Sequence, residues 1–116
     1  MGLSIIRVEH RSQLHTFIRL PSQLPGRRAN YVPPLWADEE EFHSPDKNAS
    51  LRACHYERWL AIADGAVVGR LMGIVHPAYN ALHGERTARF YQLAAIDAND
   101  VVSALLSQAE TWARAQ

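Results

Sequence analysis

Residues 59–76 have the sequence WLAIADGAVVGRLMGIVH, and this stretch decides the fold. Two apolar runs flank Asp64-Gly65, a preferred pair for a two-residue turn whose central residues both have positive φ. The pattern therefore predicts a β-hairpin. Alternation along its second run places Val67, Gly69, Leu71, Gly73 and Val75 on one face and Val68, Arg70, Met72 and Ile74 on the other. Because both faces are largely apolar, we expect helices to cover both sides of the sheet.

Apolar periodicity on either side of the hairpin predicts the remaining main elements. Residues 3–9 read as a first strand, and Ser12 is a candidate cap for a helix that Pro21 and Pro25-Gly26 end. Residues 87–96 read as a further strand, and Asp97 or Asn99 caps the final helix. The continuous apolar face of that helix consists of Val101, Val102, Leu105, Leu106, Ala109, Trp112 and Ala113. We expect this face to pack on the sheet.

Residues 26–50 have few periodic apolar positions and contain three prolines. We expect Pro25-Gly26 to separate them from the preceding helix. We also expect a packed loop around Pro33-Pro34, and its apolar anchors are Tyr31, Val32, Leu35 and Trp36. Asp38 then caps a short helix that begins with Glu39, Glu40 and Glu41. The acidic run is either a solvated helix start or a site for a metal or an amine, and it lacks the central Gly of a calcium loop.

The side chains that could carry chemistry do not form a known catalytic motif. Cys54 and His55 are adjacent, so on a strand they would point to opposite faces and rarely meet. Residues 76–86 read as a loop that contains His76 and His83, but no third or fourth zinc ligand follows at the usual spacing. The sequence therefore predicts no metal site, and it contains no glycine-rich phosphate loop and no Gly-x-Ser-x-Gly.

Composition excludes several classes of protein. A chain of 116 residues suits a single domain, 1–116, and twelve basic residues balance twelve acidic ones. No overall charge attracts nucleic acid or an anionic membrane, and no apolar segment is long enough for a membrane span. Cys54 is the only cysteine, so an internal disulfide is impossible. We expect a cytoplasmic protein without nucleic-acid or membrane partners.

Several segments together resemble a known superfamily. They are FIRLPSQLPGRRANYVPPL from residue 17, DKNAS from residue 46, AIADGAVVGRLMGIV from residue 61, the segment with Asn80 and Glu85, and AETWARA from residue 109. The chain resembles the amino-terminal half of bacterial GNAT-like, acyltransferase-related proteins. The resemblance implies an α+β fold of order β-α-α-β-β-β-α with a mostly antiparallel sheet. It also implies a truncated domain that lacks the second half of the family's fold.

The resemblance further implies acetyl-CoA or another acyl-CoA as cofactor and an amine as substrate. In GNAT enzymes the fourth strand is splayed by a bulge and pairs with the pantetheine, and the next loop holds the pyrophosphate at a helix N-terminus. The corresponding cofactor-binding candidates are Leu93, Ala95, Asn99 and Val101. Residues 96–101 depart from the family pattern, because they contain no Gly or Arg. Each of Asp97 and Asp100 would repel a pyrophosphate by on the order of a few kcal/mol before screening by solvent and salt. Tyr91 and Glu57 are candidates for the catalytic acid or base.

Two functional hypotheses follow. The first is a degenerate or partial GNAT-like domain that serves as a binding or assembly module with little catalysis alone. The second is an acyl-CoA-dependent N-acetyltransferase whose site is completed by dimerisation. Without a fifth strand, the strand at residues 87–96 would be an open edge, so a homodimer is expected in either case.

Overall fold

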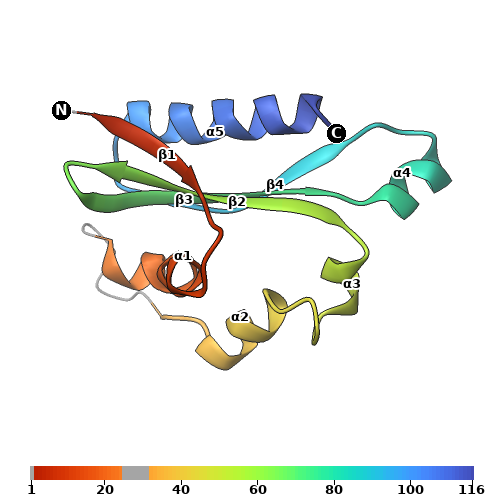
Figure 1. Ribbon diagram of the computed structural model, residues 1–116, viewed down its shortest axis with the longest axis horizontal. Helices are drawn as coiled ribbons and strands as arrows, with labels where there is room; N and C mark the ends of the chain where they lie inside the picture. Colours follow the sequence, from red (N-terminus) through yellow and green to blue (C-terminus); the bar gives the residue numbers. More distant parts are fainter. Residues whose placement is uncertain (1, 25–31) are drawn as a thin grey trace.

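The computed structural model describes residues 2–24 and 32–116 of the protein. The elements are β1 (Leu3–Arg7), α1 (Arg11–Gln23), α2 (Trp36–Phe42), α3 (Ala49–Arg52), β2 (His55–Ala63), β3 (Ala66–Val75), α4 (Pro77–His83), β4 (Ala88–Ala95) and α5 (Asn99–Arg114). The strands form one antiparallel sheet in the order β1-β2-β3-β4. Helix α5 covers one face, and α1, α2 and α3 lie on the other (Figure 1). The expected α+β class with helices on both faces is confirmed.

The hairpin of β2 and β3 forms at the predicted turn. Asp64 and Gly65 have φ of 52° and 80°, as a two-residue turn with two positive φ values requires. A register shift between Ala61 and Ile62 was not predicted. Because of this bulge, Val67 packs with the cluster under α1 and Val68 packs with the cluster under α5, so the predicted faces of these two valines were wrong.

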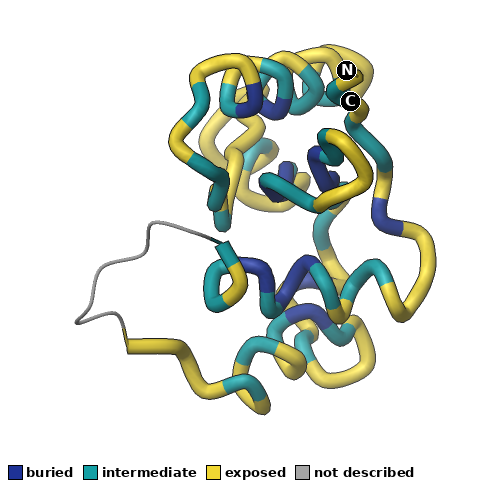
Figure 2. Tube along the Cα trace, turned by 90° about the vertical axis from the view of Figure 1, so that its left-hand side faces the viewer, coloured by how far each residue is buried: buried dark blue, intermediate teal, exposed yellow. Residues whose placement is uncertain are grey.

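Two glycines of β3 allow α5 to approach the sheet closely. A Cβ on Gly69 would lie 2.9 Å from Leu105 Cδ1, and a Cβ on Gly73 would lie 2.8 Å from Trp112 Cζ3. The Trp112 ring meets that of Trp59 on β2 edge to face, with 5.8 Å between ring centroids. Figure 2 shows the buried residues gathered between the helical layers and the sheet. The predicted apolar face of the last helix is thus the face that contacts the sheet.

Arg70 points to the opposite side of β3 and joins it to α1. Helix α1 includes Pro21 and ends at Gln23, whereas the sequence predicted that Pro21 and Pro25-Gly26 together end it. A proline has no N–H, so the carbonyl of Phe17 lacks its helical donor. The buried Arg70 supplies one, because its Nη1 donates to the Phe17 carbonyl at 2.7 Å and to that of Ile18 at 3.3 Å. The tertiary contact therefore lets the helix include a proline.

Several local predictions were wrong. Residues 77–83 form α4 rather than a loop, with Pro77 in the first turn and Gly84 at the C-cap with φ of 63°. Helix α3 was also missed. His10, Leu35 and Ala98 occupy the N-cap positions where Ser12, Asp38, and Asp97 or Asn99 were expected. Val32 and Leu35 are exposed rather than anchored. Pro25, Gly26 and Tyr31 lie outside the described residues.

The contact between α5 and β3 predicts the effect of a methyl group at Gly73. We expect Gly73→Ala to lower the free energy of unfolding by about 1–3 kcal/mol, because the two tryptophan rings must move apart. Chemical denaturation measures this change. Gly2→Ala is the control, since a Cβ there meets open space. Equal stability of the two variants would contradict the close packing of α5.

The contact between Arg70 and the Phe17 carbonyl predicts coupling with Pro21. We expect Arg70→Met to cost about 1–3 kcal/mol, because a buried carbonyl then has no donor. In a Pro21→Ala background the new N–H can bond that carbonyl, so the same change should cost about 1 kcal/mol less. Denaturation of the four proteins of the double-mutant cycle measures the coupling. Identical costs in both backgrounds would show that Arg70 does not replace the missing N–H.

Candidate functional site

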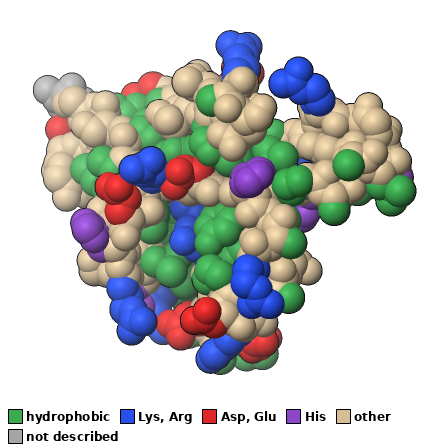
Figure 3. All heavy atoms as spheres, turned by 45° about the vertical axis from the view of Figure 1, so that its right-hand side comes forward, with side chains coloured by type: hydrophobic (Ala, Val, Ile, Leu, Met, Phe, Trp, Pro, Cys, Tyr) green, Lys and Arg blue, Asp and Glu red, His purple; other side chains and the backbone are tan. Residues whose placement is uncertain are grey.

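Strand β4 is an edge strand with exposed apolar side chains. It pairs with β3 on one side, and no other described strand pairs with it. Phe90, Tyr91 and Leu93 are 59%, 49% and 39% exposed. Figure 3 shows hydrophobic side chains reaching the surface on the side of the molecule that it displays. An open edge offers both backbone hydrogen bonds and apolar contacts to a partner.

A bulge interrupts β4 near its middle. Tyr91 pairs with Met72 and Ala94 pairs with Arg70, so Gln92 and Leu93 both lie opposite the single residue Leu71. Gln92 has φ of 58°, in the left-handed region that non-glycine residues rarely adopt. Such a bulge leaves one residue unpaired and bends the strand. The edge is therefore splayed at Gln92.

Four polar side chains form what we call the bulge network: Glu39, Gln92, His43 and Arg58. His43, which is 1% exposed, has its Nε2 2.8 Å from Gln92 Oε1 and its Nδ1 3.0 Å from Arg58 Nη1. Gln92 Nε2 donates to Glu39 Oε2 at 3.0 Å. The network runs from β2, through the end of α2, to the bulge in β4, so it crosses the sheet on the side of α1 and α2.

The guanidinium of Arg58 determines which nitrogen of His43 donates and which accepts a hydrogen bond. An arginine only donates, so His43 Nδ1 accepts and Nε2 carries the hydrogen that it donates to Gln92. The pKa of His43 is lowered from 6.5 to about 4. Burial is the largest cause, the bond to Gln92 opposes it, and the positive charges of Arg58 and Arg70 add to the lowering. His43 is therefore neutral at pH 7.

The two candidates for acid or base lie on opposite faces of the sheet. Tyr91 lies on the side of α2, where its ring centroid is 5.6 Å from that of Phe42. Glu57 lies on the side of α5, where it lines a hollow together with Trp112 and is 3.8 Å from Arg7 Nη1. Burial raises the pKa of Glu57, while the charge of Arg7 acts in the other direction. The structure does not bring the two side chains to one substrate, and either role stays a prediction.

The cofactor-binding candidates surround the end of β4. Leu93 and Ala95 lie on the strand, Asn99 is the first residue of α5, and Val101 is buried against Gly69. The side chain at the N-cap, Ala98, cannot cap the helix, so no side chain bonds its first-turn amides. Asp97 and Asp100 are exposed beside these amides. The helix start thus has free donors but carries negative charge, and its binding role is untested.

Cys54 contacts a histidine other than the adjacent one. Its Sγ is 2.9 Å from His76 Nδ1 and 3.1 Å from the carbonyl of Ser50. Burial raises the pKa of Cys54, so the thiol form is favoured. His83 instead packs on the ring of Tyr79, with 4.2 Å between centroids. Within residues 2–24 and 32–116, no three His, Cys, Asp or Glu side chains are arranged to hold a metal ion.

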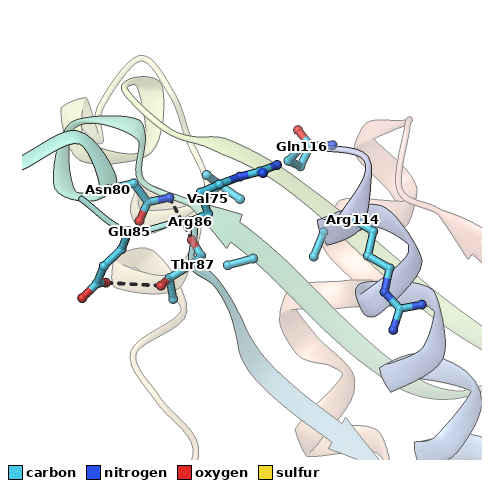
Figure 4. Close-up of a pocket in the computed structure, with 9 residues that line it drawn as sticks. Val75, Asn80, Glu85, Arg86, Thr87, Arg114 and Gln116 are labelled. Atoms are coloured by element: carbon cyan, nitrogen blue, oxygen red, sulfur yellow. Dashed lines mark hydrogen bonds between the residues drawn. The ribbon is translucent and has the colours of Figure 1, made fainter. Parts of the chain in front are cut away.

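A hollow lies at the start of β4, at the opposite end of the strand from α5's first residue. It has a volume of about 560 Å³, and Arg86 and Arg114 line it from two sides. Figure 4 shows their guanidinium groups pointing in different directions. Thr87 Oγ1 donates to Glu85 Oε2 at 3.2 Å, and the Thr87 carbonyl accepts from Asn80. The two arginines do not converge on one point, so this hollow is not an evident anion site.

A smaller hollow of about 320 Å³ lies between β4 and α5. Phe90, Leu106 and Trp112 line it, together with other mainly apolar residues. It is next to the exposed edge of β4, on the face opposite the bulge network. Of the described helices, none has the length and hydropathy that a membrane crossing requires.

Sequence reasoning did not identify His43, Gln92 or Arg58. None of these three residues lies in a recognisable motif, and no spacing rule relates residues 43, 58 and 92. The only available signal was the polar Gln92 in the middle of an apolar strand. Sequence reasoning placed Glu39 in a solvated helix start, but its carboxylate accepts a hydrogen bond from β4.

The low pKa of His43 predicts a pH dependence of stability. Between pH about 4 and 6.5 the unfolded chain binds a proton at this site and the folded protein does not, so stability rises with pH. As the pH falls through that range, the protein should lose up to about 3 kcal/mol. His43→Gln preserves both hydrogen bonds and should flatten this slope, whereas His15→Gln on the exposed side of α1 should not. Denaturation at several pH values tests this, and an unchanged slope in His43→Gln would contradict it.

Comparison with known proteins gives relatives that are much longer than this chain. No known protein-family profile matches it. Protein YghO of Escherichia coli K12 is 31% identical over 107 residues, which are 92% of this chain and 27% of that protein. A Caulobacter vibrioides protein named bacterial ceramide synthase is 29% identical over 115 residues, which are 98% of this chain and 30% of that protein. The chain therefore spans less than a third of these two relatives.

A solved structure has a closely similar fold. It is a tandem GNAT protein from the clavulanic acid biosynthesis pathway, determined without AcCoA, and it matches with a TM-score of 0.62 and 24% identity. The match covers 97% of this chain and 33% of that one. The element order, the antiparallel sheet and the helices on both of its faces agree with this likeness. The protein therefore has a partial GNAT-like fold.

Proposed function

We propose that this domain is an acyltransferase-type module that binds a second GNAT-like unit through β4 and has little catalytic activity alone. The open β4 edge, with its exposed Phe90, Tyr91 and Leu93, is the observation that carries this proposal. A strand edge with apolar side chains is unfavourable in water and favours association. A homodimer through this edge would cover these side chains.

Low activity of the isolated domain is expected from the positions of its polar side chains. Tyr91 and Glu57 lie on opposite faces of the sheet. Asp97 and Asp100 would repel the pyrophosphate of a CoA at the start of α5. A domain with these features is better suited to assembly than to independent acyl transfer.

The relatives support the acyltransferase class. One relative is named a ceramide synthase, and a ceramide is a long-chain amine that carries an acyl group on its nitrogen. The solved relative is described as a tandem GNAT protein, which supports a unit that acts beside another of its kind. For this chain, a second copy is the partner that we propose.

The second candidate is an acyl-CoA-dependent N-acetyltransferase whose site is completed by dimerisation. The bulge at Gln92 favours it, because a splayed strand leaves backbone groups available to a pantetheine arm. The first-turn amides of α5, which no side chain caps, could then bind phosphate. The hollow between β4 and α5 could accept an acyl chain.

The proposed dimer can be tested by light scattering at micromolar concentration. We expect a dimer, and Phe90→Glu should convert it to a monomer because it places charge on the edge of β4. Leu82→Glu is the control, since Leu82 is an apolar side chain that is 81% exposed on α4 and does not belong to β4. A monomeric unmodified protein would refute assembly through β4.

Calorimetry with acetyl-CoA and with a longer acyl-CoA separates the two candidates. The assembly module should give no heat with either, whereas the dimeric enzyme should bind with micromolar affinity. If binding occurs at the start of α5, the double variant Asp97→Asn and Asp100→Asn should bind roughly three- to tenfold more tightly, because charge repulsion is removed. Asp46→Asn, an exposed residue between α2 and α3 on the other face of the sheet, is the control. Unchanged affinity in the double variant would place the phosphates elsewhere.

A further inference from the structure

We infer that the bulge network is a positioning device, which holds Gln92 in its left-handed conformation and so determines what can pair with the edge of β4. The inference concerns Glu39, Gln92, His43 and Arg58. It rests on the proposed function only for the identity of the partner. The effect on the shape of β4 stands without it.

The left-handed backbone conformation of Gln92 must be stabilised by contacts with other residues. Only glycine adopts φ near 58° without strain, and other residues do so where their surroundings hold them. Both polar atoms at the end of the Gln92 side chain are bonded, Oε1 to His43 and Nε2 to Glu39. These two bonds fix the side chain against α2, and an extended backbone at Gln92 would turn the side chain away from α2.

His43 is suited to hold Gln92 because it is buried away from water and contacted on several sides. Its ring meets those of Phe17 and Phe42 edge to face, with centroids 5.4 and 5.0 Å away, and Arg58 fixes its other nitrogen. Loss of the contact with Gln92 would leave a buried N–H without an acceptor. The core therefore favours the conformation in which Gln92 stays bonded.

The bulge also sets the register of the second half of β4. Ala95 pairs with Gly69, and its Cβ lies 3.2 Å from where a Cβ of that glycine would be. If the bulge were lost, the residues after it would shift by one, and each would move to the other face. A straight β4 would then present an unbroken edge to a partner strand, whereas the bulged edge has no regular pairing position at Gln92 and Leu93.

Amide hydrogen exchange of residues 91–93, measured by NMR at pH 7 without ligand, tests the role of His43. We compare His43→Leu, which removes both hydrogen bonds, with His43→Gln, which can keep them. We expect exchange about tenfold or more faster in His43→Leu and nearly unchanged in His43→Gln. Equal exchange in His43→Leu and the unmodified protein would overturn the inference.

Two further pairs of variants keep the test decisive if His43→Leu does not fold. Glu39→Ala removes the acceptor at the outer end of the network, and Glu41→Ala, at an exposed position of the same helix, is its matched control. We expect faster exchange at residue 92 in Glu39→Ala alone. Gln92→Gly should retain the bulge because glycine tolerates this φ, while Gln92→Ala should straighten β4 and alter the exchange of residues 91–93. Identical behaviour within either pair would contradict the inference.

The experiments distinguish a failure of the inference about the bulge network from a failure of the proposed function. The exchange experiments contain no ligand, so failure to bind acyl-CoA leaves them unaffected. If the protein is a monomer, Gln92→Ala should still alter the exchange of residues 91–93. If instead the dimer forms but exchange is the same in every variant, the assembly proposal stands and the role of the network is refuted.

Discussion

The hydrogen bond from Arg70 to the carbonyl of Phe17 connects the core of the protein to its candidate site. It compensates for the missing N–H of Pro21 and holds α1 against β3. The Phe17 ring then contacts His43, and His43 bonds Gln92 in the bulge of β4. The shape of the open edge thus depends on a chain of contacts that begins at a buried arginine.

The two sides of β3 carry different kinds of contact. On one side, Gly69 and Gly73 leave room for α5, and the packing is apolar and close. On the other side, Met72 and Ile74 pack in an apolar cluster with Phe17, and polar side chains beside it bond one another between the sheet and α2. Apolar packing provides most of the stability of such a domain, whereas a buried polar network favours one particular arrangement of its partners. The bulge network therefore specifies the shape of β4 more than it stabilises the fold.

How far the candidate site could be predicted differs from residue to residue. The exposed strand that contains Tyr91 and Leu93 was predicted from its position in the order of elements. The bulge was expected only from the resemblance to GNAT proteins, and no sequence rule assigned it to Gln92. His43 was not identified at all, because its role comes from partners at residues 58 and 92, and local patterns carry no information on such distant contacts. Pro77 and Gly84, in contrast, are local signals for α4 that sequence reasoning could have used.

The sequence by itself determined the hairpin turn at Asp64-Gly65, the alternation of apolar residues in most of β3 and the apolar face of α5. These features depend on backbone conformation and on periodicity, which neighbouring residues specify. Only the tertiary structure decided that α1 continues through Pro21, that Val67 and Val68 face opposite sides from those predicted, and that Gln92 adopts a left-handed conformation. In each of these cases a contact or strand pairing between distant residues compensates for a local cost, and its energy exists only in the folded chain.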